Sequence, residues 1–414
     1  MQTDAILKGL RVIEASAFVA APLGGMTLAQ LGAEVIRVDP IAGGLDYKRW
    51  PVSKNNTSLF WCGLNKSKKS VAIDLASAEG RELVTALITA PGPDAGLLLT
   101  NFPPRGFLDY EALKKRRADL IQLTISGDRQ GGSAVDYTVN PRLGIPFLTG
   151  GGGDTEVWNH VLPAWDLVTG NMAVIGILAA ERLRRQTGEG QHIQLALEDA
   201  ALAVMGHLGF IAEAQLGTAR QRINNDLFGA FGRDFKTADG ERIMIVGLTL
   251  KQWHALCQAT GLQQSIAELE KKLDINLDDE GNRFRTREEI AAMLSPWVNA
   301  RSLAQVTQAF EKTGVCWSKY QTVQQLVTSD PACSTANPLF SDVEQKDVGN
   351  WLVPGLPLCF SGVERAPAKP APQLGEHTEQ VLSELLGLGS AELGRLFDKG
   401  LIGAPSAKSA SLVG

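Results

Sequence analysis

The chain has few cysteines and no long apolar run, and each shortage excludes a class of protein. Its 414 residues include five cysteines, which are far apart and form no C-x-x-C pair. This distribution argues against a disulfide framework and a zinc site, and it favours reduced thiols. No apolar stretch has transmembrane length, and the first ten residues lack the apolar core of a signal peptide. We therefore expect a cytoplasmic protein without membrane association.

An excess of positive charge is also missing. Forty Lys and Arg residues face 45 Asp and Glu residues, so the net charge of −5 offers no general attraction for nucleic acid. The G-x-G-x-x-G turn of dinucleotide-binding proteins is absent, because residues 16–21 read SAFVAA where it would stand. This disfavours an NAD-dependent enzyme. The composition, 44% hydrophobic and 21% charged, is typical of a globular protein long enough for two domains.

The most informative stretch is residues 163–202, which read as helix, turn, strand and helix. Apolar residues recur at spacings of three and four along one side of the first helix, namely Trp165, Val168, Met172, Ile175, Ala179 and Leu183. The opposite side is nearly as apolar, so the pattern predicts a helix buried on both sides. Gly170 and Gly176 would let another backbone come close. Gly188 ends the helix, and a strand over His192–Leu197 follows.

Asp166 is the acidic residue in the first turn of this helix. Pro163 is a typical residue for a helix start, and a carboxylate just after it interacts favourably with the free N–H groups and the helix dipole. The ordinary interpretation is a capping aspartate. The alternative is a reactive carboxylate, and this segment alone does not separate the two.

The first 130 residues alternate between short apolar strands and helices. The expected strands are Arg11–Ala15, Val35–Val38, Val71–Leu75, Gly96–Thr100 and Leu120–Ile125. The expected helices between them are Pro22–Leu31, Glu79–Ile88 and Tyr110–Arg117. This alternation predicts an α/β fold with a doubly wound parallel sheet.

After Leu202 the pattern changes. A long helical connection is expected over Ala203–Ile223, followed by a hairpin that turns at Asp239-Gly240. Amphipathic helices are expected at Leu250–Thr260, Arg287–Asn299 and Leu303–Thr313, with the charged run Glu268–Arg285 exposed and a last helix at Thr378–Leu386. We therefore divide the chain into the first part of a large domain (1–205), a linker with a small domain (206–330), and a return to the large domain (331–414).

Six short motifs, in a fixed order around Asp166, resemble a known family. They are LKGLRVIE, LGAEVIRVDP with Gly43-Gly44, LNKSKKSVAIDL, TNF, LDYEAL and LGEHTEQVL. In the Asp166 segment, Thr-Gly, an arginine and Thr-Gly-x-Gly-Gln follow the aspartate. This set is similar to the family III CoA-transferases. The resemblance implies a large Rossmann-like domain, a smaller inserted α/β domain, and a homodimer of interlocked chains.

The resemblance also implies roles for single residues. Asp166 matches the catalytic nucleophile of the family. The positions that match CoA contacts are Val19, Ala20, Asn65, Lys66, Lys68, Asn101, Phe102, Ser126, Gly127 and Arg129. The lysines would supply charge for the phosphates of CoA, although a solvated turn explains a lysine-rich run equally well. Phe102 is equally compatible with a place in the core.

The implied chemistry is covalent. The carboxylate of Asp166 would attack an acyl-CoA thioester, and the exchange would proceed through an aspartyl mixed anhydride and an aspartyl-CoA thioester. Backbone N–H groups near Ala20 or Gly229 are candidates for holding the oxyanions. This chemistry requires no metal and no cofactor beyond the CoA that the substrate carries.

Within the family, some stretches are most similar to the branch that moves CoA between the two carboxyl groups of one mesaconate. They include EASAFVAAPLGGMTLAQLGAEVIRVDP, VDYTVNP and LFGAFGRDF. The resemblance therefore implies an intramolecular transferase that acts as an isomerase on the acyl-CoA of a dicarboxylic acid. The second carboxylate needs a cation, for which Lys48, Arg49 and Arg233 are candidates, each equally compatible with the surface. Gly229 lies in the stretch that matches a glycine-rich loop which closes over the active site in some family members, although only Gly229 and Gly232 are present here.

Three alternatives stay open. An intermolecular CoA-transferase acting on two different acids would use the same catalytic residues. An α-methylacyl-CoA racemase would pair Asp166 with a histidine about thirty residues earlier as the second acid or base. Residues 131–136 contain no histidine, which disfavours this reaction. A non-enzymatic CoA-binding module would require an idle Asp166.

Overall fold

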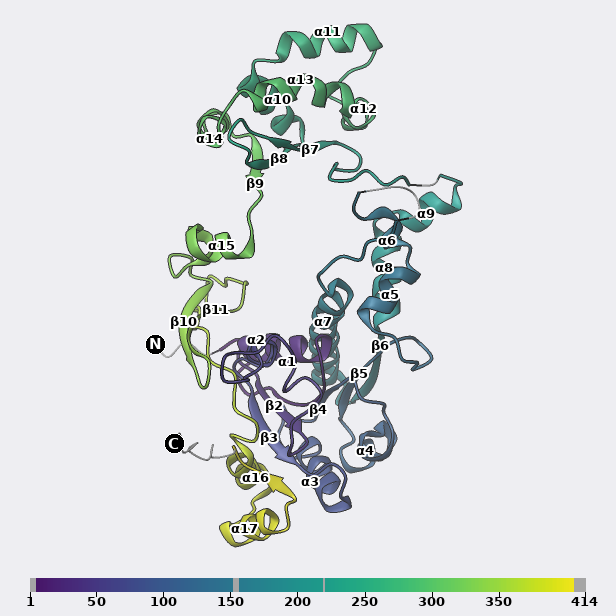
Figure 1. The fold of residues 1–414 in the computed structure, drawn as a ribbon. Helices are drawn as coiled ribbons and strands as arrows, with labels where there is room; N and C mark the ends of the chain where they lie inside the picture. Colours follow the sequence, from purple (N-terminus) through teal and green to yellow (C-terminus); the bar gives the residue numbers. More distant parts are fainter. Residues whose placement is uncertain (1–4, 152–155, 219, 406–414) are drawn as a thin grey trace. The chain divides into compact units, whose positions relative to one another are not determined.

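The computed structural model describes residues 5–151, 156–218 and 220–405. Its contacts divide the chain into two compact units. Figure 1 shows the chain coloured along its sequence from purple to yellow. The large unit comprises the described residues of Met1–Leu143, Val161–Gln215 and Pro331–Gly414, and the small unit those of Gly144–His160 and Leu216–Asp330. The chain therefore leaves the large unit twice and returns twice. Among the described residues, no helix is both long and apolar enough to cross a bilayer.

A seven-stranded sheet forms the centre of the large unit. Its strands are β1 (Arg11–Ala15), β2 (Glu34–Asp39), β3 (Lys69–Ile73), β4 (Leu97–Thr100), β5 (Ile121–Ser126), β6 (Gln191–Ala196) and β12 (Ile402–Gly403). Their order is β12-β3-β2-β1-β4-β5-β6, and every neighbouring pair is parallel except β12 with β3. The direction of winding switches between β1 and β4. The predicted doubly wound α/β fold is confirmed.

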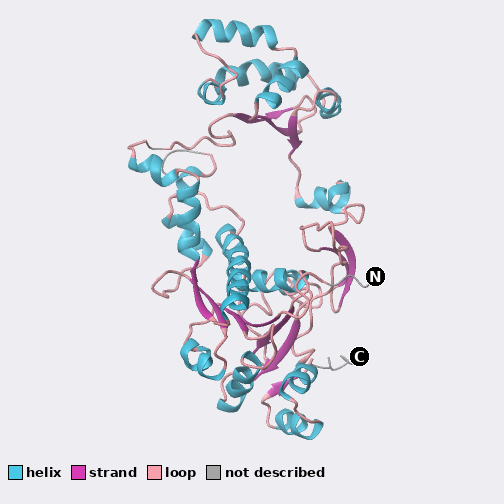
Figure 2. Cartoon of the chain, turned by 180° about the vertical axis from the view of Figure 1, so that it is seen from behind, coloured by secondary structure: helices cyan, strands magenta, loops and turns pink. Residues whose placement is uncertain are grey.

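Helices cover both faces of this sheet, because successive residues of a strand point to opposite sides. On one face, Val12 and Leu97 pack with helices α1 (Ala20–Gln30) and α7 (Ala164–Thr187). On the other face, Ile13 and Leu98 pack with α3 (Ala78–Ile88), α4 (Tyr110–Arg116), α16 (Thr378–Leu386) and α17 (Ser390–Asp398). Figure 2 shows helices around the strands from behind. Helix α16 has the expected bounds, but it is not the last helix, since α17 follows it.

Helices α1 and α7 cross with their backbones almost in contact. A Cβ on Gly170 would lie 2.7 Å from the carbonyl oxygen of Ala20, and a Cβ on Gly24 would lie 3.1 Å from the carbonyl oxygen of Gly170. The close backbone approach predicted for α7 is thereby confirmed at Gly170, whereas Gly176 meets the side chain of Leu123 instead. Gly188 ends α7 in the left-handed conformation, with a φ of 77°.

The prediction that α7 is buried on both sides is wrong for the single chain. Met172, Ile175 and Leu183 expose 45%, 59% and 45% of their area. Leu202 in α8 (Leu197–His207) and Leu208 just after it are exposed as well. The described part of the chain therefore leaves apolar side chains of α7 and α8 uncovered.

The remaining elements of the large unit are short. They are α2 (Leu59–Leu64), η1 (Gly106–Leu108), α5 (Asp136–Arg142), α9 (Phe210–Gln215), η2 (Pro331–Cys333) and the antiparallel pair β10 (Phe340–Gln345) and β11 (Gly349–Pro354). The expected long helical connection after Leu202 is wrong. Helix α8 ends at His207, Gly209 takes a left-handed φ of 80°, and α9 ends at Gln215.

The small unit has its own antiparallel sheet and hydrophobic core. The sheet consists of β7 (Phe231–Lys236), β8 (Arg242–Gly247) and β9 (Cys316–Lys319). The helices are α6 (Ile145–Leu148), α10 (Leu250–Thr260), α11 (Gln263–Leu273), α12 (Glu280–Arg285), α13 (Arg287–Asn299), α14 (Leu303–Glu311) and α15 (Val323–Ser329). The predicted hairpin and amphipathic helices are confirmed. The charged run is not wholly exposed, because Arg283 is buried and donates to the carbonyl oxygens of Gly247 and Leu277.

Candidate active site

A cavity of about 800 Å³ lies in the large unit, beside the carboxyl ends of the central strands. Phe18, Asn101 and Ser126 line it from the ends of β1, β4 and β5, and Asp166 lines it from the start of α7. Open α/β sheets bind ligands where the winding direction switches, which here is between β1 and β4. The topology and the cavity therefore identify the same place.

The loop between β1 and α1 forms one wall of the cavity, and Asn101 holds it. Asn101 Oδ1 accepts a hydrogen bond from the backbone N–H of Ala17 (2.9 Å), and its Nδ2 donates to the carbonyl oxygen of Ala17 (2.8 Å). Phe18 follows with a φ of 66°, and Val19 and Ala20 begin α1. Asn101 thus joins the ends of two adjacent strands and fixes the loop that lines the cavity.

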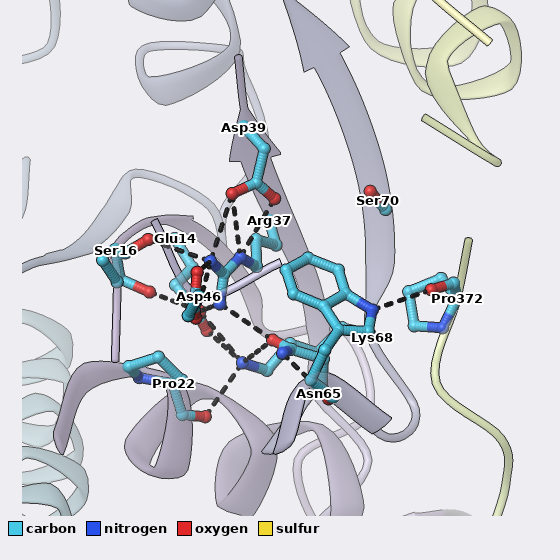
Figure 3. A network of polar contacts seen from close by, with 12 residues as sticks. Glu14, Ser16, Pro22, Arg37, Asp39, Asp46, Asn65, Lys68, Ser70 and Pro372 are labelled. Atoms are coloured by element: carbon cyan, nitrogen blue, oxygen red, sulfur yellow. Dashed lines mark hydrogen bonds and ion pairs between the residues drawn. The ribbon is translucent and has the colours of Figure 1, made fainter. Parts of the chain in front are cut away.

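A buried network of charged side chains supports the first part of this loop (Figure 3). Arg37 in β2 donates to the carbonyl oxygen of Ser16 over 3.0 Å. The same guanidinium forms ion pairs with Asp39 (3.0 Å) and Asp46 (2.8 Å), and all three side chains are almost fully buried. Buried charges need such partners, because an unpaired buried charge is strongly destabilising. The backbone of Ser16 is therefore held by a side chain that is itself fixed.

Lys68 supports the first turn of α1, which follows the loop, in the same way. Its ammonium lies 2.8 Å from the carboxylate of Glu14 and donates to the carbonyl oxygen of Pro22 (2.8 Å) and to Asn65 Oδ1 (2.9 Å). Burial lowers the pKa of Lys68 to about 8, although Glu14 opposes the shift. Lys66 is buried as well and donates to a backbone carbonyl oxygen over 3.0 Å. These residues stand outside the lining of the cavity, so their predicted contacts with CoA remain predictions.

The carboxylate of Asp166 stands in the cavity without a hydrogen-bond or ion-pair partner among the described residues. Its pKa is raised to about 7, chiefly by burial and also by the negative charge of Asp136, while the positive charge of Arg49 acts to lower it. A carboxylate without a partner, in a cavity and with a perturbed pKa, is a candidate for chemistry.

Asp136, and not Asp166, supplies the acceptor for the first turn of α7. Asp136 Oδ2 accepts hydrogen bonds from the backbone N–H groups of Trp165 (2.7 Å) and Asp166 (3.1 Å). Free N–H groups at a helix start require such an acceptor. No local signal at Pro163 indicates this role, because the acceptor comes from another helix 30 residues earlier.

Arg49 is the cation in the lining of the cavity. Its guanidinium carbon lies 5.5 Å from the centre of the Phe18 ring and 5.1 Å from that of the Phe60 ring. Aromatic faces attract a guanidinium and limit its orientations. Among the described residues, no carboxylate forms an ion pair with Arg49. Its charge is therefore available to a ligand.

The structure brings eight of the predicted site residues together in this cavity: Val19, Ala20, Arg49, Asn101, Phe102, Ser126, Gly127 and Asp166. Arg129 is exposed and pairs with Asp199 (3.0 Å). Gly229 and Arg233 belong to the small unit, where Arg233 lies 2.5 Å from the carboxylates of both Asp226 and Glu288. The lining also includes residues that sequence analysis did not identify, among them Phe60, Tyr137 and Leu197. Within the described ranges, no three His, Cys, Asp or Glu side chains are grouped to hold a metal ion.

Comparison with known proteins gives consistent results. Residues 7–378 match CoA-transferase family III. The chain is 59% identical over 402 residues to a 2-methylfumaryl-CoA isomerase of Chloroflexus aurantiacus, covering 97% of this chain and 98% of the relative. It is 30% identical to a succinate–glutarate CoA-transferase of Agrobacterium fabrum, covering 92% and 95%. A solved structure of a CaiB/BaiF family protein from Brucella suis superposes with a TM-score of 0.73 at 26% identity, covering 92% and 99%.

Proposed function

The chain belongs to CoA-transferase family III and is an enzyme, and we propose that it moves CoA between the two carboxyl groups of one mesaconate (2-methylfumarate) with Asp166 as the nucleophile. The observation that carries the proposal is the Asp166 carboxylate, which stands in the cavity without a partner among the described residues. The isomerase at 59% identity supports the choice of substrate. CoA takes part as a component of the substrate, as in the rest of the family.

The proposed reaction has four steps on one carboxylate. Asp166 attacks the carbon-1 thioester carbonyl, which forms a mixed anhydride and releases CoA thiolate. The thiolate attacks the aspartyl carbonyl, which gives an Asp166–CoA thioester and free mesaconate. The carbon-4 carboxylate of mesaconate then attacks this thioester, which forms a second mixed anhydride with Asp166 and releases the thiolate again. Finally the thiolate attacks the carbon-4 carbonyl, which yields the isomeric thioester and restores Asp166.

The start of α1 is our candidate for holding the negative charge that develops. Val19 occupies the N-cap position without a side-chain cap, so the N–H groups of the first turn, including that of Ala20, lack a side-chain acceptor. Such groups, together with the helix dipole, stabilise anions. Gly229 remains the second candidate. Val19 and Ala20 remain candidates for the pantetheine arm, and Asn65, Lys66 and Lys68 for the nucleotide end. The other candidates for CoA contact are Asn101, Phe102, Ser126, Gly127 and Arg129.

Arg49 would bind the carboxylate that is not being exchanged. Its charge faces the cavity, and it already lowers the pKa of Asp166. Mesaconate carries two carboxylates, so one cation can hold the first while the other reacts with Asp166. Arg233 stays a candidate, although two carboxylates of the small unit already neutralise it.

We also propose that the enzyme is a homodimer. The exposed apolar side chains of α7 and α8, such as Ile175 and Leu202, are the supporting observation, because uncovered apolar surface of this kind marks protein interfaces. Sedimentation should give a particle of twice the chain mass at micromolar concentration. A stable monomer would contradict the dimer and leave the chemistry untouched.

Incubation of pure protein with carbon-1 mesaconyl-CoA tests the reaction. We expect the carbon-4 thioester to appear without added acid. In excess isotope-labelled free mesaconate the product should stay unlabelled, because a retained acceptor reacts at an effective molarity of up to about 10⁵–10⁸ M. Label in the product at the rate of turnover would instead favour intermolecular transfer. Conversion of a 2-methylacyl-CoA between its stereoisomers would favour the racemase, although no histidine stands among the described lining residues.

A further inference from the structure

Asp136 and Asn140 clamp the start of α7 from a neighbouring helix. They stand four residues apart in α5, so their side chains lie on one face, and each is only 1% exposed. Asp136 Oδ2 accepts from the N–H groups of Trp165 and Asp166, and Asn140 Oδ1 accepts from the indole N–H of Trp165 over 3.1 Å. Backbone and side chain of the turn that carries the nucleophile are therefore fixed by the same short helix.

Asp136 occupies the free N–H groups that the carboxylate of Asp166 could otherwise cap. Pro163 occupies the N-cap of α7 and has no side-chain acceptor to offer. An Asp in the first turn of an uncapped helix tends to bond free N–H groups nearby, as capping carboxylates do. Here those groups already donate to Asp136, and the carboxylate of Asp166 makes no hydrogen bond within the described chain. Asp166 is thereby left to face the cavity.

We propose that Asp136 is a positioning residue for catalysis, which holds the first turn of α7 so that the Asp166 carboxylate points into the cavity instead of capping its own helix. This inference rests on the proposed function, in which Asp166 is the nucleophile. Asp136 also acts through its charge. Its second oxygen, Oδ1, is buried without a hydrogen-bond partner among the described residues, so its negative charge is poorly screened beside Asp166.

The charged and titratable groups around Asp166 are few in the described part of the cavity. Asp136 in α5 raises the pKa of Asp166, and Arg49 in the loop after β2 lowers it, both after the larger effect of burial. Tyr137, also in α5, donates its hydroxyl to the carbonyl oxygen of Val161 (3.0 Å). A substitution that removes the charge of Asp136 should therefore lower the pKa of Asp166.

Two variants distinguish the role of Asp136 as a hydrogen-bond acceptor from the effect of its negative charge. Asp136→Asn keeps an oxygen for the two N–H groups and loses the charge, whereas Asp136→Ala loses both. We expect Asp136→Ala to lower kcat by about 10–100-fold with little change in KM, since a misplaced catalytic group costs this much. Asp136→Asn should keep kcat within about 3-fold of the native enzyme at pH 8. The matched control is Asp109→Ala, which removes the capping carboxylate of α4, outside the cavity lining, and should leave kcat unchanged.

A second readout needs no turnover. A water-soluble carbodiimide labels protonated carboxyl groups, so labelling of Asp166, located by peptide mass spectrometry, should fall as pH rises through its pKa. The midpoint should move to lower pH in Asp136→Asn and stay in place in Asp109→Ala. An unmoved midpoint in folded Asp136→Asn, or native kcat in folded Asp136→Ala, would overturn the proposal. If the native protein turns over no acyl-CoA and the midpoint still moves, the proposed function fails and the positioning role stands.

Discussion

Gly25 leaves the space that the carboxylate of Glu14 occupies. A Cβ on residue 25 would lie 1.7 Å from Glu14 Oε2, which no side chain can tolerate without displacement. Glu14 is fully buried in β1 and pairs with the equally buried Lys68. One glycine in α1 therefore makes room for the ion pair that supports the loop lining the cavity.

Gly25→Ala should destabilise the protein strongly. The added methyl group would push Glu14 away from Lys68 and leave a buried charge without its partner, which costs about 3–5 kcal/mol when the pair is fully broken. Urea unfolding measures the change in free energy. The control is Gly394→Ala in α17, where nothing lies within 4 Å of the added Cβ, and where alanine should stabilise by about 0.5–1 kcal/mol. Equal stability of the two variants would contradict the prediction.

Gly170→Ala should impair activity through packing alone. The new Cβ would lie 2.7 Å from the carbonyl oxygen of Ala20, so α1 must shift away from α7 together with the cavity wall that it carries. We expect kcat/KM to fall about 10–100-fold, with a stability loss of about 1–3 kcal/mol. Gly206→Ala in α8 is the control, because its Cβ would meet a single atom at 3.9 Å. Native kinetics in Gly170→Ala would mean that the crossing tolerates the methyl group.

Arg49→Ala should weaken binding of the dicarboxylic acyl group. Loss of a charge-assisted hydrogen bond to a carboxylate costs about 1.5–3 kcal/mol, which corresponds to a rise in KM of about 10–150-fold. Lys48→Ala is the matched control, since this neighbouring cation lines a different cavity, with Tyr47 and Trp61. Steady-state kinetics with mesaconyl-CoA would decide. A similar effect of both substitutions would indicate general electrostatic attraction instead of a specific contact.

Asp166→Asn should stabilise the protein in neutral and alkaline solution. Burial, with a contribution from Asp136, raises the pKa of Asp166 from 3.8 to about 7. Between these values the folded state holds a proton that the unfolded state has released, so native stability decreases as pH rises through this window. The amide avoids this loss, and above pH 7 the variant should be more stable by about 1–3 kcal/mol, with allowance for partial exposure.

Urea unfolding of both proteins at pH 4 and pH 8, at one protein concentration, measures this effect. The difference in unfolding free energy should be small at pH 4, which is close to the ordinary pKa of 3.8 so that the unfolded native protein still holds part of the proton, and largest at pH 8. If Asp166→Asn is no more stable than the native protein at pH 8, burial does not destabilise the ionised carboxylate of Asp166.

The local pattern of apolar and glycine residues was sufficient to predict the main strands and helices of the large unit. The strands from β1 to β6 are short apolar runs separated by helices, and Gly170 marks a close helix crossing because its missing side chain has a local structural meaning. Asp166 was placed correctly in the first turn of α7 for the same reason. These features depend on near neighbours in the sequence, which a single chain displays directly.

Features that depend on distant segments were not predictable in this way. Lys68 stands in a lysine-rich turn that reads as solvated, and only the tertiary fold places Glu14 beside it. Asp136 caps a helix that begins far along the chain. The exposed side of α7 was expected to be buried, because the apolar pattern of a helix does not show whether its own chain covers that side. Glu14, an acid inside an apolar strand, was the one local sign of a buried cation nearby.

Mass spectrometry of the acid-quenched enzyme, after brief incubation with carbon-1 mesaconyl-CoA, tests the role of Asp166 most directly. We expect a CoA thioester on the peptide that contains Asp166. The adduct should disappear on treatment with hydroxylamine and be absent from folded, inactive Asp166→Asn. An adduct on another residue, or turnover by the folded Asp166→Asn protein, would contradict it.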